Sequence, residues 1–206
     1  MQPAEFLFVA SGVLTPPLLP HLKERILQGV PADDYTCLKP ALVQALNSLA
    51  AGGLDAAGFW ERIASLLGRR EMHRELEARF LDGFHLNLPT WDIACQLRRL
   101  FRVSFVLDYP FTWWEAAWAN VSVASRDGEI NLISAGTALV DRMPENVPAL
   151  LKFWRINPSR CLCIDAHPRR AVLAVRQGVH AMVYVDEFRL RRELVLRRIL
   201  PELSTV

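Results

Sequence analysis

Hydrophobic residues form an unbroken run near the start of the chain, and a turn of small residues ends the run. Residues 6–10 read Phe-Leu-Phe-Val-Ala, and Ser11 and Gly12 follow them. An unbroken apolar run of this length is typical of a strand buried on both faces, as in a parallel sheet. Ligands bind at the carboxyl ends of the strands in open α/β sheets. We therefore expect a central strand here, with a candidate site beside Ser11.

The pattern changes to helical spacing after Pro16, Pro17 and Pro20, which mark a connection that leaves the sheet. Apolar side chains then recur at intervals of three and four residues, which predicts amphipathic helices. The predicted helix faces are Leu42, Leu46 and Leu49; Phe59, Ile63, Leu66 and Leu67; and Met72, Leu76 and Phe80. No strand pattern interrupts them, so this stretch predicts a small, all-helical subdomain.

From residue 88 onward, short apolar strands alternate with helical segments. The expected strands are residues 103–107, 130–133, 161–164 and 181–185, and the expected helices are residues 91–100, 112–121, 147–154 and 168–177. This alternation implies parallel pairing through right-handed crossovers, with helices on both faces of the sheet. Together with the first strand, it predicts an α/β fold with a doubly wound, five-stranded parallel sheet.

Composition adds few constraints. The chain has 206 residues, 51% of them hydrophobic, which suits one good core or a core with a smaller insertion. Its longest apolar run is too short to span a bilayer, and no Lys or Arg precedes it, so we expect neither a membrane segment nor a signal peptide. Cys37, Cys95, Cys161 and Cys163 lack metal-ligand spacing, which favours reduced thiols in a cytoplasmic protein and no metal site.

Charge is distributed unevenly. Residues 1–150 carry 13 basic and 17 acidic side chains, whereas residues 151–206 carry 11 and 5. Much of the excess lies in a terminal helical pattern, whose solvated basic face is one interpretation. The alternative is contact with an acidic protein partner or a second copy of the chain, through Arg191, Arg192 and Arg198. No nucleic-acid-binding motif accompanies these residues, so nucleic acid is not the expected partner.

An aromatic cluster follows the second strand. It contains Tyr109, Phe111, Trp113, Trp114 and Trp118. Trp114 and Trp118 are four residues apart and share one face of a helix, which leaves Trp113 pointing elsewhere. These rings either fill the gap between the helical subdomain and the sheet, or form a docking surface with Trp113 as an anchor.

Two stretches resemble motifs of the haloacid dehalogenase (HAD) superfamily. Gly-Val-Leu at residues 12–14 matches the end of the first motif, an apolar strand followed by Asp-x-Asp-Gly-Val/Thr-Leu. Residues 157–170 are similar to the fourth motif, a proline-containing turn and an apolar strand that ends in acidic residues. The resemblance covers essentially the whole chain. It implies a HAD-like core of residues 1–14 and 88–206, with a helical cap of residues 15–87.

The resemblance also implies where the chain departs from family chemistry. That chemistry uses a nucleophilic aspartate, a second aspartate as general acid and base, a Ser or Thr with a Lys, and acidic residues that bind Mg²⁺. The matching positions here hold Val9, Ser11, Asp108, Met143 (with Arg142 beside it), Asp165 and Ala166.

These departures predict a catalytically silent protein that acts in binding, regulation or scaffolding, with no catalytic residue and no cofactor. A single carboxylate holds Mg²⁺ poorly against water, so we do not expect the metal to bind well. Ser11, Asp108, Arg142 and Asp165 are candidate ligand-binding remnants of the site. Two alternatives stay open. One is a phosphatase-type hydrolase in which Asp108 or Asp165 activates water, and the other is a small-ligand sensor that uses the former active-site pocket.

Overall fold

The computed structural model describes residues 3–119, 131–134, 151 and 155–201. The helix expected at residues 147–154 lies outside this part of the chain except for Leu151, and Arg142 lies outside it altogether.

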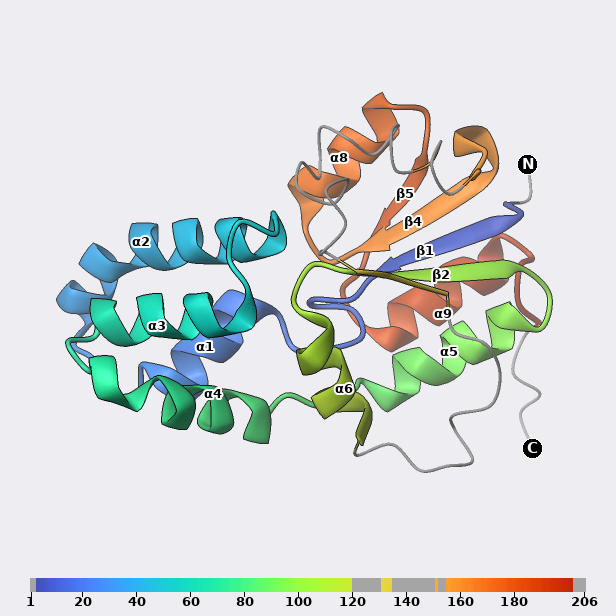
Figure 1. Ribbon diagram of the computed structural model, residues 1–206. Helices are drawn as coiled ribbons and strands as arrows, with labels where there is room; N and C mark the ends of the chain where they lie inside the picture. The colour runs from blue at the N-terminus through green and yellow to red at the C-terminus, as the bar shows by residue number, and fades with distance from the viewer. Residues whose placement is uncertain (1–2, 120–130, 135–150, 152–154, 202–206) are drawn as a thin grey trace.

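Five parallel strands form a single sheet, in the order β3-β2-β1-β4-β5 (Figure 1). The strands are β1 (Glu5–Val9), β2 (Arg102–Leu107), β3 (Asn131–Ser134), β4 (Cys161–Asp165) and β5 (His180–Val183). The apolar run near the start of the chain is the central strand, since β1 pairs with both β2 and β4. The α/β fold class and the five-stranded parallel sheet are therefore confirmed.

The helices form two groups. The first group contains α1 (Leu18–Ile26), α2 (Ala32–Ala50), α3 (Ala56–Leu66), the short 3-10 helix η1 (Arg70–Met72) and α4 (His73–Asp82). The second contains α5 (Leu88–Arg98), α6 (Phe111–Ala119), the 3-10 helix η4 (Pro158–Arg160), α8 (Pro168–Arg176) and α9 (Glu187–Leu196). In Figure 1, α1 to α4 lie together beside the carboxyl ends of the strands, α5 and α9 cover one face of the sheet, and α8 covers the other.

The alternation of side chains along β1 separates two hydrophobic cores. Phe6 and Phe8 belong to the larger core, which continues through α5 and into the helices of the first group. Leu7 and Val9 belong to a smaller core on the opposite face, beside α8. Successive side chains of a strand point to opposite faces, so an unbroken apolar run is what a strand covered on both sides requires. Among the described residues, no helix is both long and apolar enough to cross a membrane.

A tight turn follows β1 and aims the chain toward α1. The amide of Ala10 still donates to the carbonyl of Val106 (2.8 Å), and the amide of Gly12 donates to the carbonyl of Thr15 (2.8 Å). Gly12 has a φ of +81°, and a Cβ atom built on it would lie 2.7 Å from the Cβ of Ala166. Glycine is needed here both for the left-handed backbone and for the close approach of the loop that follows β4.

Trp113 joins the first group of helices to the sheet domain. Its side chain is fully buried (0% exposed) and packs against rings of α3, α4, the segment between α4 and α5, and the segment after β2. These rings are Phe59, Trp60, Phe80, Phe84 and Tyr109. The interpretation of Trp113 as an anchor of a docking surface is therefore wrong, because a residue with no exposed surface cannot meet a partner. The other interpretation, a filler between the helical subdomain and the sheet, describes its position.

Trp113→Ala should lower the free energy of unfolding by about 3–5 kcal/mol, since it empties a large, ring-lined space. Phe111→Ala in the same helix is the control, because Phe111 is 44% exposed and should lose much less. Urea unfolding followed by circular dichroism measures both values. Equal losses in the two variants would show that Trp113 does not carry the contact between α6 and the first group of helices.

Gly12→Ala should destabilise the protein more than Gly178→Ala. Both glycines have a left-handed backbone, with φ of +81° and +82°, but only Gly12 has a neighbouring atom where the new Cβ would lie. The strain of the left-handed conformation, about 1–2 kcal/mol, is common to both variants, so their difference in unfolding free energy reports the clash. Adding Ala166→Gly to Gly12→Ala should remove much of that difference. A double variant no more stable than Gly12→Ala would rule the clash out.

Candidate functional site

Three polar side chains meet at the carboxyl ends of the central strands. Ser11 lies two residues past β1, Asp108 directly follows β2, and Asp165 is the last residue of β4. All three are buried, with 8%, 7% and 1% of their surface exposed. Because β1 is hydrogen-bonded between β2 and β4, residues at these three strand ends must be neighbours. The convergence expected from the sequence is therefore what the fold produces.

Arg170 lies between the two carboxylates and was not identified from the sequence. Its Nη1 donates to Oδ2 of Asp108 (2.8 Å), and its Nη2 donates to Oδ1 of Asp165 (2.9 Å). Its Nε lies 2.8 Å from Oδ2 of Asp165, so the guanidinium meets that carboxylate side-on. Arg170 is in the first turn of α8, five residues after Asp165. This spacing across a strand-to-helix turn is the only signal that the sequence offers.

Backbone amides complete the network. The amide of Ser11 donates to Oδ1 of Asp108 (3.1 Å), and the amide of His167 donates to Oδ1 of Asp165 (2.8 Å). The hydroxyl of Ser11 accepts a hydrogen bond from the amide of Leu18 (3.3 Å), at the start of α1. Each oxygen of both carboxylates therefore faces at least one donor, which is what buried charges require.

Burial and ion pairing determine the direction in which the pKa values of Asp165 and Arg170 change. Burial raises the pKa of Asp165, and the positive charge of Arg170 opposes that change. For Arg170, burial disfavours the charged form, but the two carboxylates outweigh it and raise the pKa above its ordinary value. With the guanidinium and both carboxylates ionised, the cluster carries a formal charge of −1. A buried arginine placed in this way is held by charge on both sides.

A pocket of about 250 Å³ opens directly above the cluster. Ser11, Asp108, His167 and Arg170 supply the polar part of its lining, together with Asn47. Much of the lining comes from α1, the residue before it, and α2: Pro17, Leu18, Leu19, Pro20, Leu46, Asn47 and Ala50. The pocket is thus mostly apolar, with a few convergent polar groups, as small-molecule sites are. Trp114 does not fill it, because this ring packs against Trp91 and Phe105.

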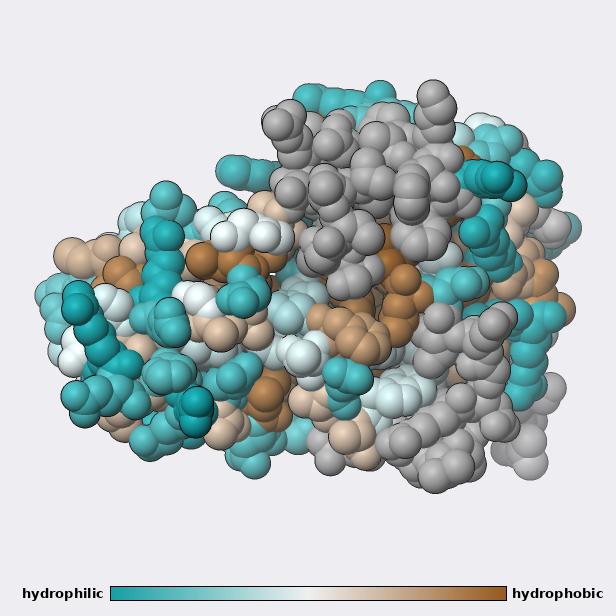
Figure 2. All heavy atoms as spheres, viewed as in Figure 1, coloured by the Kyte–Doolittle hydropathy of each residue, from teal (hydrophilic) through white to brown (hydrophobic). Residues whose placement is uncertain are grey.

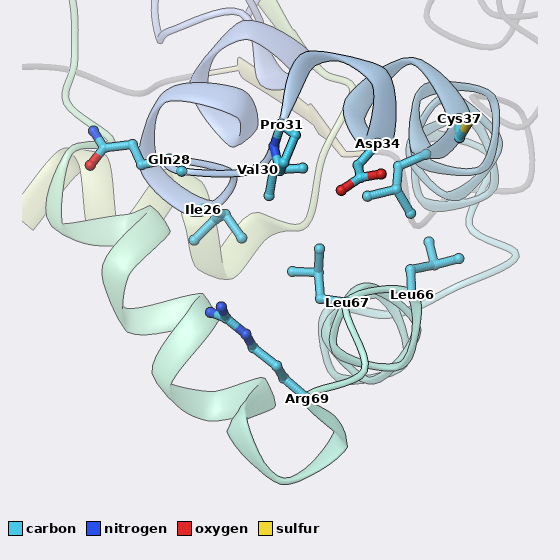
Figure 3. Close-up of a pocket in the computed structure, with 11 residues that line it drawn as sticks. Ile26, Gln28, Val30, Pro31, Asp34, Cys37, Leu66, Leu67 and Arg69 are labelled. Atoms are coloured by element: carbon cyan, nitrogen blue, oxygen red, sulfur yellow. The ribbon is translucent and has the colours of Figure 1, made fainter.

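A second hollow, of about 510 Å³, lies among the helices of the first group (Figure 3). Apolar side chains such as Ile26, Val30 and Leu67 line it, and the side chain of Arg69, from the segment before η1, extends toward them. No residue of the sheet or of the polar cluster contributes to its lining. Of these two hollows, the smaller one is therefore the one that contains the chemistry of the carboxylates.

The residues at the strand ends do not fit a divalent cation. Val9, at the end of β1, has no side-chain oxygen and is fully buried. Both oxygens of Asp165, and Oδ2 of Asp108, face the guanidinium of Arg170. Mg²⁺ needs carboxylate oxygens that are free to enter its near-octahedral shell. Nowhere in the described part of the chain do three or more His, Cys, Asp or Glu side chains form a cluster suited to a metal ion.

Of the basic candidates, Arg191 and Arg192 lie in α9 and Arg198 follows that helix. Nη1 of Arg191, in α9, donates to Oε1 of Gln96 (3.3 Å), which ties α9 to α5. Arg192 and Arg198 are exposed. Figure 2 shows the polar and apolar surface on one side of the molecule, including teal, hydrophilic side chains over the first group of helices.

Solved structures provide the comparison, since no family model and no curated protein matches the sequence significantly. A HAD family enzyme from Bacteroides thetaiotaomicron superposes with a TM-score of 0.69 at 15% identity, covering 93% of this chain and 100% of that one. A predicted HAD-like hydrolase from Porphyromonas gingivalis gives 0.68 at 15% identity, over 95% and 98%. L-2-haloacid dehalogenase from Xanthobacter autotrophicus gives 0.62 at 16% identity, over 98% and 85%.

These neighbours correct the leading functional hypothesis. A catalytically silent binding, regulatory or scaffolding protein was expected, but the similar structures are named as enzymes. The Bacteroides enzyme was crystallised with magnesium and inorganic phosphate, and the dehalogenase with chloropropionic acid covalently bound. The alternative hypothesis of a hydrolase agrees with them better. At 15–16% identity the likeness establishes the architecture, and this chain has the fold of the HAD-like superfamily.

Proposed function

We propose that the protein is a HAD-like hydrolase with an altered mechanism, in which Asp108 activates a water molecule for direct attack on the substrate. One observation supports it most. A carboxylate held by two donors lines a pocket of about 250 Å³ at the carboxyl ends of the strands. A covalent route through the end of β1 is not proposed, because the side chain of Val9 has no nucleophilic atom.

Asp108 is a better candidate base than Asp165. Asp108 lines the pocket, whereas Asp165 lies beneath it, with 1% of its surface exposed. Each carboxylate oxygen has about two acceptor sites. Oδ1 of Asp108 receives the amide of Ser11, and Oδ2 receives Arg170, which leaves acceptor capacity on both oxygens for a water molecule. General base catalysis requires this hydrogen-bonding reach before anything else.

Arg170 can also position the substrate. A guanidinium has five N–H donors. Nη1 and Nη2 of Arg170 each donate one hydrogen bond to Asp108 or Asp165, and Nε lies in ion-pair contact with Asp165. One N–H on each of Nη1 and Nη2 therefore remains for an acceptor in the pocket, which Arg170 lines. A carbonyl or phosphoryl oxygen held there would be polarised for attack.

At phosphorus the proposed step is a single displacement, and at an ester carbonyl carbon it is addition of water followed by loss of the leaving group. The water oxygen bonds to the electrophilic carbon or phosphorus as its proton passes to Asp108, and the bond to the leaving oxygen breaks. His167 lies at the side of the pocket and is placed to protonate the leaving oxygen. The formal charge of −1 on the cluster repels a doubly charged phosphate monoester. Neutral esters and singly charged phosphodiesters are therefore the better substrates.

Asp108→Asn should reduce turnover by about 10²–10⁴-fold, since the amide cannot accept the proton of water. A panel of p-nitrophenyl esters, phosphodiesters and phosphomonoesters measures the activity of purified protein, with and without EDTA. Asp92→Asn, an exposed carboxylate of α5, is the matched control and should leave turnover unchanged. We expect EDTA to have no effect.

Absence of turnover on the whole panel, or full activity in Asp108→Asn, would contradict the proposal. Thermal stabilisation by small metabolites without turnover would instead support the ligand sensor, which the same pocket could serve. Loss of activity in EDTA would point to a metal-dependent route.

We make two further proposals, one on the cellular compartment and one on a binding partner. We infer a reducing, cytoplasmic setting, supported by four cysteines that are all free thiols. We also keep a protein partner or a homodimer for the basic end of the chain. The exposed side chains of Arg192 and Arg198 support it, together with the 79% exposed ring of Phe188 at the start of α9.

A further inference from the structure

We propose that the guanidinium of Arg170 is a built-in substitute for a divalent cation, so that removing this side chain creates a metal-binding site. The inference rests on the proposed function in that it concerns the same pocket, but its test measures binding and not turnover.

The charge balance of the cluster supports this substitution. Asp108 and Asp165 come from different strands and are both buried, so their ionised forms require a cation between them. Three nitrogen atoms of Arg170 lie 2.8–2.9 Å from three of their four oxygens. Nothing else that is positively charged contacts either carboxylate in the described residues; their remaining donors are the neutral amides of Ser11 and His167.

The way the fold holds the guanidinium also supports the substitution. Arg170 lies in the first turn of α8, which packs against β4 and β5. Its side chain needs to reach only from this turn to the end of β4, and it is 21% exposed. The planar fork of arginine matches a carboxylate side-on, as it does at Asp165. The cation is therefore part of the chain and is fixed in position by the fold.

Removal of the Arg170 side chain would leave a site suited to a metal ion. Arg170→Ala would free three carboxylate oxygens around one space, beside a pocket through which water can enter. Mg²⁺ typically binds through one or two carboxylates and keeps several waters. Arg170→Ala would offer two carboxylates and access for water, whereas in the wild type the guanidinium of Arg170 occupies the carboxylate oxygens.

Isothermal titration calorimetry with MgCl₂ and MnCl₂ on metal-free protein tests this directly. We expect wild type to show no saturable binding and Arg170→Ala to show saturable binding, through the two freed carboxylates. Arg170→Lys is the matched control, because its ammonium keeps a positive charge in the space and should prevent binding. Arg170→Ala combined with Asp108→Asn should lose the new site, because one of its two carboxylates is gone.

Saturable Mg²⁺ binding by wild type, or none by Arg170→Ala, would overturn the inference. If Arg170→Ala is unfolded in metal-free buffer, circular dichroism during the MgCl₂ titration replaces calorimetry. Recovery of the helical signal, abolished by Asp108→Asn, would support a metal that restores the lost charge. Failure to recover would contradict it. Neither outcome depends on turnover, so a protein without hydrolase activity could still confirm the cation substitution.

Discussion

A buried ion pair network dominates the functional end of this molecule. Two carboxylates at the ends of β2 and β4 would repel each other strongly in a region with little water, and the guanidinium of Arg170 makes their burial possible. The amide of Ser11 adds a donor from the turn after β1. Three neighbouring strands and α8 are thereby linked at one point, and the pocket lies on that point.

The rest of the fold serves to hold this point in place. The central strand is covered on both faces, and the turn that follows it depends on a glycine in contact with the loop after β4. The cluster of rings around Trp113 fixes the helices of the first group against the sheet, and α1 and α2 supply the wall of the pocket that faces Asp108. Packing far from the carboxylates therefore determines the shape of the space above them.

Much of the fold was predictable from the sequence, because strands buried on both faces have a distinctive pattern. Residues 161–164 were identified as a strand for this reason, and the strand extends by only one residue, to Asp165. The last strand was less well predicted: Val183 and Val185 are apolar, but 42% and 58% exposed, and β5 ends at Val183. Arg170 could not be identified, since its link to Asp108 joins residues 62 positions apart. No local pattern encodes such a pairing.

In the proposed site, the guanidinium of Arg170 lies where the chemistry associated with this fold would place a metal ion. A crystal structure of the wild-type protein, grown with a high concentration of magnesium chloride, tests that claim most directly. We expect electron density for Arg170 between Asp108 and Asp165, and no metal ion within coordination distance of either carboxylate. A magnesium ion bound to both carboxylates, with the arginine displaced into the pocket, would contradict it.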